Sequence, residues 1–434
     1  MSKKAVIFGM PRIGLSIVLG IEGFSLFALY TIGYKVAPFL VGIALSIGYI
    51  SIAVFSFLFG WISDIKYTKW GRRKPYIIIF SPLIGLSFIF LMMPSLILPD
   101  LNNKIVLFIW LLIWEIIFKA SYGITTPYQA WLAEQFDINE RPKVSLIQNI
   151  FNLLGTLVNW SFILLILTEV FAQISISPNV LPFYFSIPIS IFGLLTIVLF
   201  CLNAFLMPIE PRVEIKSNLK EILKVSVKNK NFMAVNLMIG LSSIAWIIII
   251  NQMLPFFELV LNLNPNEYLL ILGINLFFVI AFLEIWRRII QKFGKKQAVL
   301  YIYILAALIL PITLLGLIPL NNFLIVGLLY MIGISASIGG WYLLPAIIFA
   351  DLAEYDEKIT GELKAGTYAG IPSIFLNIFQ AFGIFLLGAL NELPKITVSS
   401  LTYSMGLIIW SPICSLILLI SWWFTRKYLI LDYD

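Results

Sequence analysis

The stretch GWISDIKYTKWGRRKP, residues 60–75, places five basic residues and one acidic residue within sixteen positions. The chain around it is 61% hydrophobic and only 12% charged. In soluble proteins about a quarter of the residues are charged, so lipid rather than water must surround most of this chain. We therefore expect the charged stretch to be a loop between two membrane-spanning segments.

Further apolar stretches occur on both sides of this loop. A helix needs about 20 mostly apolar residues to cross a bilayer. Twelve stretches meet this condition, at roughly 11–34, 38–63, 75–97, 103–131, 143–170, 180–207, 231–260, 266–291, 296–319, 322–350, 365–392 and 399–425. The sequence thus predicts an all-α integral membrane protein with twelve transmembrane helices.

The basic residues predict how these helices are oriented. With the N-terminus counted as cytoplasmic, both tails and the even-numbered loops hold 25 of the 29 Lys and Arg residues, and the odd-numbered loops hold three. Cytoplasmic loops of membrane proteins carry an excess of Lys and Arg. We therefore expect a multi-pass protein of the cell membrane with both termini in the cytoplasm.

The two halves of the chain repeat one pattern. The loop after the second span contains Gly71-Arg72-Arg73, and the loop after the eighth contains Gly294-Lys295-Lys296. The loops after spans four and ten, PYQAWLAEQFDINERPK and PAIIFADLAEYDEK, also correspond. This repeat predicts two pseudo-symmetric six-helix bundles, at 1–208 and 231–434, joined by a cytoplasmic linker at 209–230 and enclosing a cavity near the bilayer midplane.

Several function classes are excluded or disfavoured by the residues that are missing. The sequence has no histidine, which excludes a His-ligated metal site and leaves carboxylates to carry any proton. No phosphate-binding GxxxxGK[ST] motif occurs. The bases lie in short clusters between apolar runs, so we expect membrane lipid rather than nucleic acid as their partner. No nucleophile stands beside a base, so we expect no enzymatic activity and no cofactor.

Three loops carry a resemblance to a known family. The stretch at 60–75, PYQAWLAEQFDINERPK at 127–143 and FADLAEYDEKITGELKAGTYAG at 349–370 resemble the glycoside–pentoside–hexuronide cation symporters. This family belongs to the major facilitator superfamily and includes melibiose permease and the plant sucrose carriers. The resemblance implies the major facilitator fold, transport by alternating access, and a protein that functions as a single chain.

The resemblance also implies a cytoplasmic gate. In the family, charged residues of these loops form ionic contacts between the two halves, which break when the carrier opens inward. Carried over by position, Arg141 would meet Asp351, Glu354 or Asp356, and Asp64 would approach the start of span eleven. The remaining gate candidates are Arg72 and Arg73.

The family's cation site is not matched. Where melibiose permease has intramembrane charges, the aligned positions are uncharged: Ile52, Ser56, Thr125, Asn149 and Asn377. A sodium site of this type is therefore not expected, and a proton is the more plausible coupling ion.

Few charges remain inside the predicted spans, and ionisable residues at membrane depth indicate function by default. Glu115 and Lys119 are four residues apart and could neutralise each other. Glu22 has no evident local partner. It could carry the coupling proton, or it could be a carboxyl group bonded permanently in the core.

Uncharged polar residues form the candidate sugar site. Amides bond hydroxyl groups in both directions, and aromatic rings stack on the apolar face of a sugar. The alternative is that these amides bond only to neighbouring helices. The candidates are Gln129, Gln148, Asn149, Asn152, Trp341, Tyr342, Asn377 and Gln380.

The leading hypothesis is a secondary active transporter for a small neutral sugar or glycoside, coupled to protons. An uncoupled sugar facilitator and a carrier of an amphipathic solute such as a lysolipid are the alternatives. A membrane sensor that transports nothing is the least favoured reading.

Overall fold

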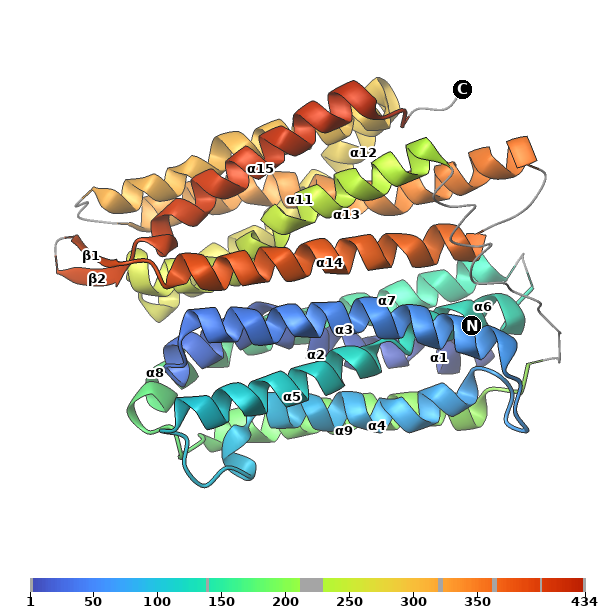
Figure 1. Ribbon diagram of the computed structural model, residues 1–434, viewed down its shortest axis with the longest axis horizontal. Coiled ribbons are helices and arrows are strands. Elements are labelled where there is room, and N and C mark those ends of the chain that lie inside the picture. Colours follow the sequence, from blue (N-terminus) through green and yellow to red (C-terminus); the bar gives the residue numbers. More distant parts are fainter. Residues whose placement is uncertain are drawn as a thin grey trace. The chain divides into compact units, whose positions relative to one another are not determined.

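The computed structural model describes residues 3–137, 140–210, 229–318, 323–360, 365–398 and 400–431. The chain divides into two compact units, Met1–Glu221 and Ile222–Asp434. Long helices make up most of both units (Figure 1).

The first unit contains the helices that correspond to the first six predicted spans. They are α1 (Lys3–Gly9), α2 (Pro11–Ala28), η1 (Leu29–Gly33), α3 (Pro38–Ile65), α4 (Lys74–Met92), η2 (Pro94–Leu96), α5 (Lys104–Tyr122), α6 (Thr125–Gln135), α7 (Arg141–Phe162), η3 (Ile163–Leu167), α8 (Thr168–Ile176) and α9 (Phe183–Leu206).

The sequence explains where several of these helices begin. Pro11, Pro38 and Pro75 lie in the first turn of α2, α3 and α4, where the missing N–H of proline has no helical partner to lose. Asn103 caps α5, because its side chain accepts hydrogen bonds from the backbone N–H groups of Ile105 and Val106.

Within this unit α3 packs against α5, α2 packs against α7 and α9, and α4 packs against α9 and α5. Small residues allow close approach: a Cβ atom on Gly85 of α4 would lie 2.3 Å from the backbone oxygen of Gly193 of α9. Such close contacts are typical of helices packed in membranes.

The second unit contains the remaining helices and one short hairpin. Its elements are α11 (Lys230–Pro255), η4 (Phe256–Val260), α12 (Pro265–Ile309), η5 (Leu310–Leu317), α13 (Leu324–Thr360), α14 (Ala365–Asn391), β1 (Lys395–Val398), β2 (Leu401–Ser404) and α15 (Gly406–Tyr428).

Eleven helical stretches of the described residues are long and apolar enough to cross a membrane. One of them runs over 45 residues, from Gly273 to Leu317, and contains a break at Gly294, where φ is 82° and ψ is 168°. These angles are not helical, so the stretch comprises two helices. The predicted spans eight and nine meet at this break. Counting the stretch as two helices gives the twelve predicted spans.

One span boundary predicted from the sequence is wrong. The twelfth span was expected to begin at 399, but β1 and β2 form an antiparallel hairpin and α15 begins only at Gly406. The tenth span ends at Phe349, close to the predicted 350, and α13 continues beyond it to Thr360. The β-branched residues at 395–402 favour strands, and the charged end of α13 extends past the apolar part.

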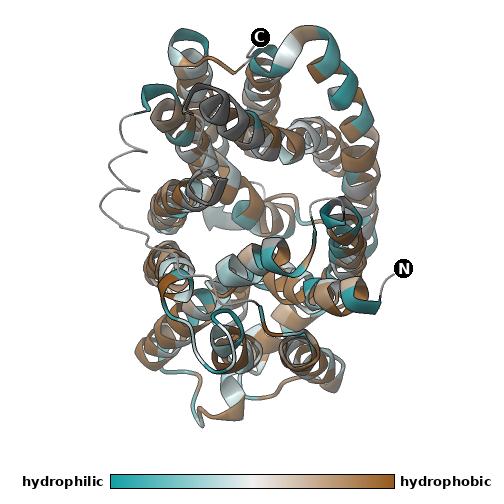
Figure 2. Cartoon of the chain, turned by 90° about the vertical axis from the view of Figure 1, so that its right-hand side faces the viewer, coloured by the Kyte–Doolittle hydropathy of each residue, from teal (hydrophilic) through white to brown (hydrophobic). Residues whose placement is uncertain are grey.

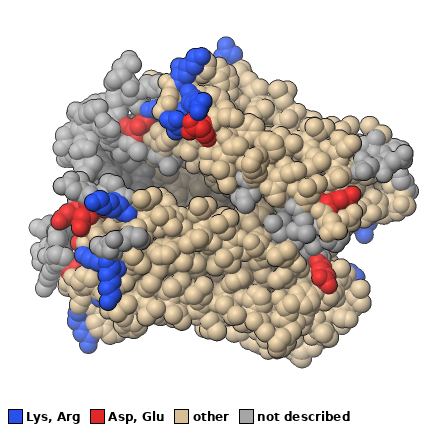
Figure 3. Space-filling model, turned by 180° about the vertical axis from the view of Figure 1, so that it is seen from behind, with Lys and Arg blue, Asp and Glu red and all other residues tan. Residues whose placement is uncertain are grey.

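The polar residues occupy the helix ends in both units. In Figure 2, brown covers most of each helix, and teal is concentrated at the ends and loops that face the viewer. In the space-filling view of Figure 3, Lys and Arg gather toward one end of each unit, and its long flank is almost entirely tan. An uncharged flank of this kind fits a surrounding of lipid.

Candidate functional site

A cluster of three buried charged side chains lies in the first unit. Lys119 Nζ on α5 lies 2.8 Å from Glu22 Oε2 on α2 and 3.9 Å from Glu115 Oε1, one turn earlier on α5. The exposed fractions of Glu22, Glu115 and Lys119 are 4%, 0% and 4%. We refer to these three side chains as the buried charge cluster.

The cluster lies near the middle of its helices. Glu115 is eleven residues from the start of α5, and Glu22 is eleven residues from the end of η1. These two ends lie on the same side of the unit, because Lys104 Nζ bonds to the carbonyl oxygen of Tyr34, just beyond η1. At 1.5 Å per residue the cluster lies about 16 Å from that side, which is half the thickness of the hydrocarbon core.

A third helix closes the cluster. The Lys119 ammonium group lies 4.5 Å from the centroid of the Tyr49 ring on α3, a cation–π arrangement. Gly48 leaves room for Glu115, because a Cβ atom there would lie 2.5 Å from Glu115 Oε1. Tyr49 was not predicted from the sequence, because it lies in an apolar run without any charge beside it.

The cluster holds two carboxyl groups and one ammonium group. Neither Glu115 oxygen accepts a hydrogen bond from any described residue. A buried carboxylate without a hydrogen-bond donor is costly, and its nearest cation, Lys119, lies 3.9 Å away, so the arrangement is chemically suited to take up one proton. The sequence predicted the Glu115–Lys119 pair and found no local partner for Glu22; the structure shows that Lys119 is closer to Glu22, from which it is 97 residues distant.

The predicted amides of the first unit fall into two groups. Gln148 is buried and its amide donates to the Tyr128 hydroxyl at 3.1 Å, so it bonds within its own unit. Asn149 and Asn152 are exposed on α7, and Asn152 accepts a hydrogen bond from Ser16 of α2. Gln129, on α6, is partly buried. Asn149 and Asn152 are therefore the exposed amides of this group.

Aromatic rings form a stack in the second unit. The Trp341 ring of α13 lies 5.7 Å from that of Trp246 on α11, at an interplanar angle of 26°, and 5.7 Å from that of Tyr303 on α12. Trp246 and Tyr303 are buried, whereas 67% of Tyr342 is exposed. The Trp341 ring is therefore already in contact with two other rings, whereas the Tyr342 ring is exposed and can contact a ligand.

The predicted amides of α14 differ in their surroundings. Asn377 is buried and donates to the Ser373 carbonyl at 2.6 Å on its own helix, and Gln380 is partly buried. Another amide pair was not predicted: Gln252 of α11 and Asn391 of α14 exchange two hydrogen bonds, at 2.8 and 2.9 Å. This pair fixes one helix against the other.

The bases of the 60–75 stretch form ion pairs within the first unit. Arg73 lies 2.6 Å from both Glu134 and Asp64, and Arg72 lies 2.8 Å from Glu134. Burial by itself lowers the pKa of Arg73, but its bonds to Glu134 and Asp64 outweigh this effect and raise the pKa. Asp64 was expected to approach span eleven; in this structure its partner is Arg73, nine residues away.

A second acid binds the same loop. The Glu210 carboxylate accepts hydrogen bonds from the backbone N–H groups of Arg72 and Arg73, and from Trp131 Nε1 at 3.0 Å. Gly71 adopts φ of 90°, and a Cβ atom there would lie 2.6 Å from Glu210 Oε1. The loop thus needs glycine for both its conformation and its space. Glu134 and Glu210 were not predicted, although Glu134 lies within the stretch at 127–143.

The second unit repeats part of this arrangement. Gly294 also has a positive φ, and the next residue, Lys295, pairs with Asp351. Arg141 donates to the carbonyl of Phe136 at 3.1 Å in the first unit. The side chains of Glu354 and Asp356 lie outside the part of the chain that the structure describes. The repeat of Gly71-Arg72-Arg73 at 294–296 is therefore visible in the backbone as well as in the sequence.

No group of three or more Cys, Asp and Glu side chains with the geometry of a metal site occurs among the described residues. The strongest candidate for an ion-handling site is the buried charge cluster, where an ammonium group of the chain itself lies beside two carboxyl groups.

The sequence matches the family model of MFS/sugar transport proteins over residues 7–429. The chain therefore belongs to this family of the major facilitator superfamily, and it is a multi-pass transporter. No curated protein sequence matches it.

Solved structures share the fold over the whole chain. The inward open xylose transporter XylE from E. coli is similar with a TM-score of 0.69 at 14% identity, covering 99% of this chain and 96% of that one. The nucleoside transporter NupG gives 0.64 at 15% identity, over 98% and 100%. A bacterial homologue of the human lysosomal transporter Spinster gives 0.66 at 12% identity, over 100% of both. These similarities confirm the major facilitator fold.

Proposed function

We propose that the protein carries a small neutral sugar or glycoside across the cell membrane by alternating access, in symport with protons. The observation that carries this proposal is the buried charge cluster, with two carboxyl groups and one ammonium group at mid-depth. The family match to sugar transport proteins and the fold shared with a D-xylose–proton symporter support it.

The charges of the cluster suggest how a proton is used. With both carboxyl groups ionised, the cluster carries one net negative charge, whereas with one proton bound it is neutral. A neutral cluster is much cheaper to keep in a low-dielectric interior. Proton binding therefore favours the state in which the cluster is closed to water, and proton release requires a state in which water reaches it.

Lys119 disfavours sodium as the coupling ion. Its ammonium group already lies within 3.9 Å of both carboxyl groups, where a bound cation would have to coordinate. Sodium would need to displace a cation that is covalently part of the chain. A proton needs no such space, because it binds to a carboxyl oxygen.

The sugar is assigned to the exposed polar and aromatic side chains. Asn149 and Asn152 offer amides that bond sugar hydroxyl groups, and Tyr342 offers an exposed ring for the apolar sugar face. Gln148 and Asn377 bond within their own units, so we assign them a supporting role. We further propose that both termini are cytoplasmic and that a single chain is the functional form.

The test is uptake of labelled mono- and disaccharides into proteoliposomes, with and without an inward proton gradient, in sodium and in potassium buffer. We expect one sugar to accumulate above its outside concentration only with the proton gradient, in either buffer. Glu22→Gln and Glu115→Gln should each abolish accumulation. The control is Glu169→Gln, which changes an exposed acid on α8 and should leave accumulation unchanged.

Other outcomes have distinct meanings. Equilibration of a sugar that ignores the gradient would show an uncoupled facilitator, in which the cluster keeps one proton bound and stays neutral throughout transport. Accumulation driven by sodium would contradict the role given to Lys119. If no sugar enters, the assigned substrate class is wrong, and amphipathic solutes such as lysolipids become the next candidates.

A further inference from the structure

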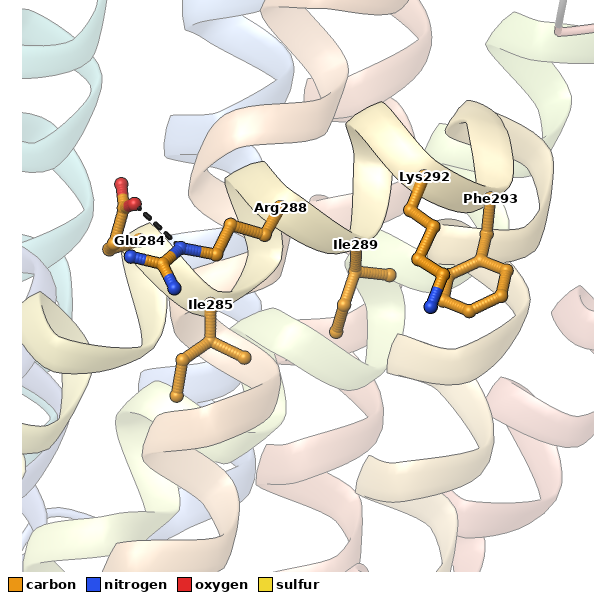
Figure 4. Close-up of a pocket in the computed structure, with 6 residues that line it drawn as sticks. All are labelled: Glu284, Ile285, Arg288, Ile289, Lys292 and Phe293. Carbon is orange, nitrogen blue, oxygen red and sulfur yellow. Dashed lines mark hydrogen bonds and ion pairs between the residues drawn. The ribbon is translucent and has the colours of Figure 1, made fainter.

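The first of the two helices within α12 ends at the break at Gly294. Just before this break its surface carries an open pocket of about 430 Å³, separate from the buried charge cluster. Six side chains line it, all from this helix: Glu284, Ile285, Arg288, Ile289, Lys292 and Phe293 (Figure 4). Ile285, Arg288, Ile289 and Lys292 follow spacings of three and four residues, which place them on one face. Basic and apolar side chains thus alternate along a single stripe.

The rotation of the helix keeps this stripe at the surface. Trp286, on another side of α12, is buried and donates a hydrogen bond of 2.6 Å to the carbonyl of Ala336 in α13. The exposed fractions of the Arg288 side chain and of Ile285 are 74% and 47%. The stripe is therefore available to a ligand, and its backbone is held in place by α13.

The depth of the stripe matches a membrane surface. Helix α12 begins at Pro265, where Asn264 and Glu267 form a capping box at one end of the span. Arg288 is 23 residues further on, about 35 Å along the helix. A hydrocarbon core is about 30 Å thick, so Arg288 and Lys292 lie at the opposite surface, and Ile285 lies one turn deeper.

Arg288 and Lys292 have nitrogen atoms that are not used in ion pairs with described residues. Glu284 forms an ion pair with Arg287 at 2.7 Å. It also lies 2.9 Å from Arg288 Nε, which holds the Arg288 guanidinium group in place (Figure 4). Among the described residues, no acid lies within ion-pair distance of Lys292, whose ammonium group lies 5.1 Å from the Phe293 ring centroid. No described residue bonds to the two terminal nitrogens of Arg288 or to the Lys292 ammonium group, so these groups can bind an anion.

We propose that this stripe binds the headgroup of an anionic phospholipid. The phosphate contacts Arg288 and Lys292, and an acyl chain runs from it toward the membrane centre along Ile285. Phe293, in edge contact with Tyr301 at 6.2 Å, lies beside the headgroup as aromatic side chains do at membrane surfaces. The Glu284 carboxylate offsets part of the positive charge of the stripe. The stripe therefore suits a ligand with the single negative charge of a phosphodiester.

Native mass spectrometry of the purified full chain tests this site, with phosphatidylglycerol or phosphatidylcholine added to the detergent micelles. We expect the wild type to retain phosphatidylglycerol in preference to phosphatidylcholine. The double variant Arg288→Gln/Lys292→Gln should bind phosphatidylglycerol ~30-fold more weakly, because each base near a membrane surface contributes about 1 kcal/mol. Ile285→Ser, which keeps both bases, should also weaken lipid binding but leave the preference between headgroups.

The matched control is Lys66→Gln/Lys69→Gln, which removes two exposed bases from the loop of the first unit and causes the same change in charge. It should keep the tight phosphatidylglycerol site. An equal loss in both double variants would overturn the proposal, since it would indicate general attraction to charge. Unchanged binding in Arg288→Gln/Lys292→Gln, equal retention of the two lipids, or displacement of the lipid by inorganic phosphate alone would overturn it as well.

Discussion

Lys119 of α5 lies 2.8 Å from Glu22 of α2, closer than the 3.9 Å to Glu115 on its own helix. The ammonium group therefore joins two helices that are far apart in the sequence. Glu115 keeps both oxygens without a hydrogen-bond donor among the described residues. Helical spacing predicts the pair of Glu115 and Lys119, but Glu115 has the weaker interaction with the ammonium group. We therefore expect Glu115 to accept a proton.

Lys119→Met should destabilise the first unit strongly. The substitution keeps most of the side-chain volume but leaves Glu22 and Glu115 buried without a cation, and breaking a buried ion pair on one side costs about 3–5 kcal/mol. We expect a clearly lower midpoint of thermal unfolding in detergent. The midpoint should recover as the pH is lowered, because protonated carboxyl groups no longer need the lysine.

The double variant Lys119→Met/Glu22→Gln provides the control for this prediction. If the two residues act as a pair, the second change should restore part of the lost stability, with a coupling free energy of about 2 kcal/mol. Strictly additive losses would show that the 2.8 Å contact contributes little.

Glu134→Gln should loosen the loop between α3 and α4. Glu134 is the common partner of Arg72 and Arg73, whose side chains are only 5% and 3% exposed. Removing its charge leaves two nearly buried guanidinium groups undercompensated, at about 3 kcal/mol. Limited proteolysis within 65–73 and the thermal midpoint both report this change.

Asp64→Asn is the comparison for Glu134→Gln. Asp64 is 37% exposed and pairs only with Arg73 among the described residues, so solvent weakens this bond and the expected loss is below about 1 kcal/mol. A larger effect for Asp64→Asn than for Glu134→Gln would contradict the central place of Glu134 in the loop.

Gly71→Ala and Gly294→Ala should each lower stability, because both positions have positive φ, at 90° and 82°. Left-handed backbone costs a non-glycine residue about 1–2 kcal/mol. Gly71→Ala should be the more damaging change, since its Cβ atom also meets the Glu210 carboxylate. Gly273→Ala is the matched control: it is helical and has nothing within 4 Å of the added atom, so its thermal midpoint should not fall.

The sequence predicts the architecture well because the bilayer restricts it. Apolar length and the distribution of bases were sufficient for the twelve spans, and the repeat of Gly71 at Gly294 predicted two similar halves. The hairpin at 395–404 escaped, since its apolar residues also satisfy the count for a span. Apolar length alone does not distinguish a short strand pair from the first turns of a helix.

The site was predicted less completely, for a reason visible in Lys119. Spacing along one helix identifies neighbours on that helix, so Glu115 was found as its partner and Glu22 was not. Contacts across helices depend on their rotation and depth, which the sequence of a single chain does not encode locally. Tyr49 and Glu210 escaped for the same reason, since neither stands beside a charge or motif related to its partner.

Tyr342 and Trp341 are adjacent in the sequence, and we expect their substitutions to act differently. Trp341 packs between Trp246 and Tyr303, so Trp341→Ala should open a cavity and cost about 3–5 kcal/mol of stability. Tyr342 is 67% exposed, so Tyr342→Ala should leave the thermal midpoint nearly unchanged. If Tyr342 stacks on the sugar, this variant should raise the KM for uptake about tenfold, with Tyr342→Phe close to wild type because the ring face remains. Equal KM values for Tyr342→Ala and wild type would exclude Tyr342 from the sugar site and direct attention to the amides of α7.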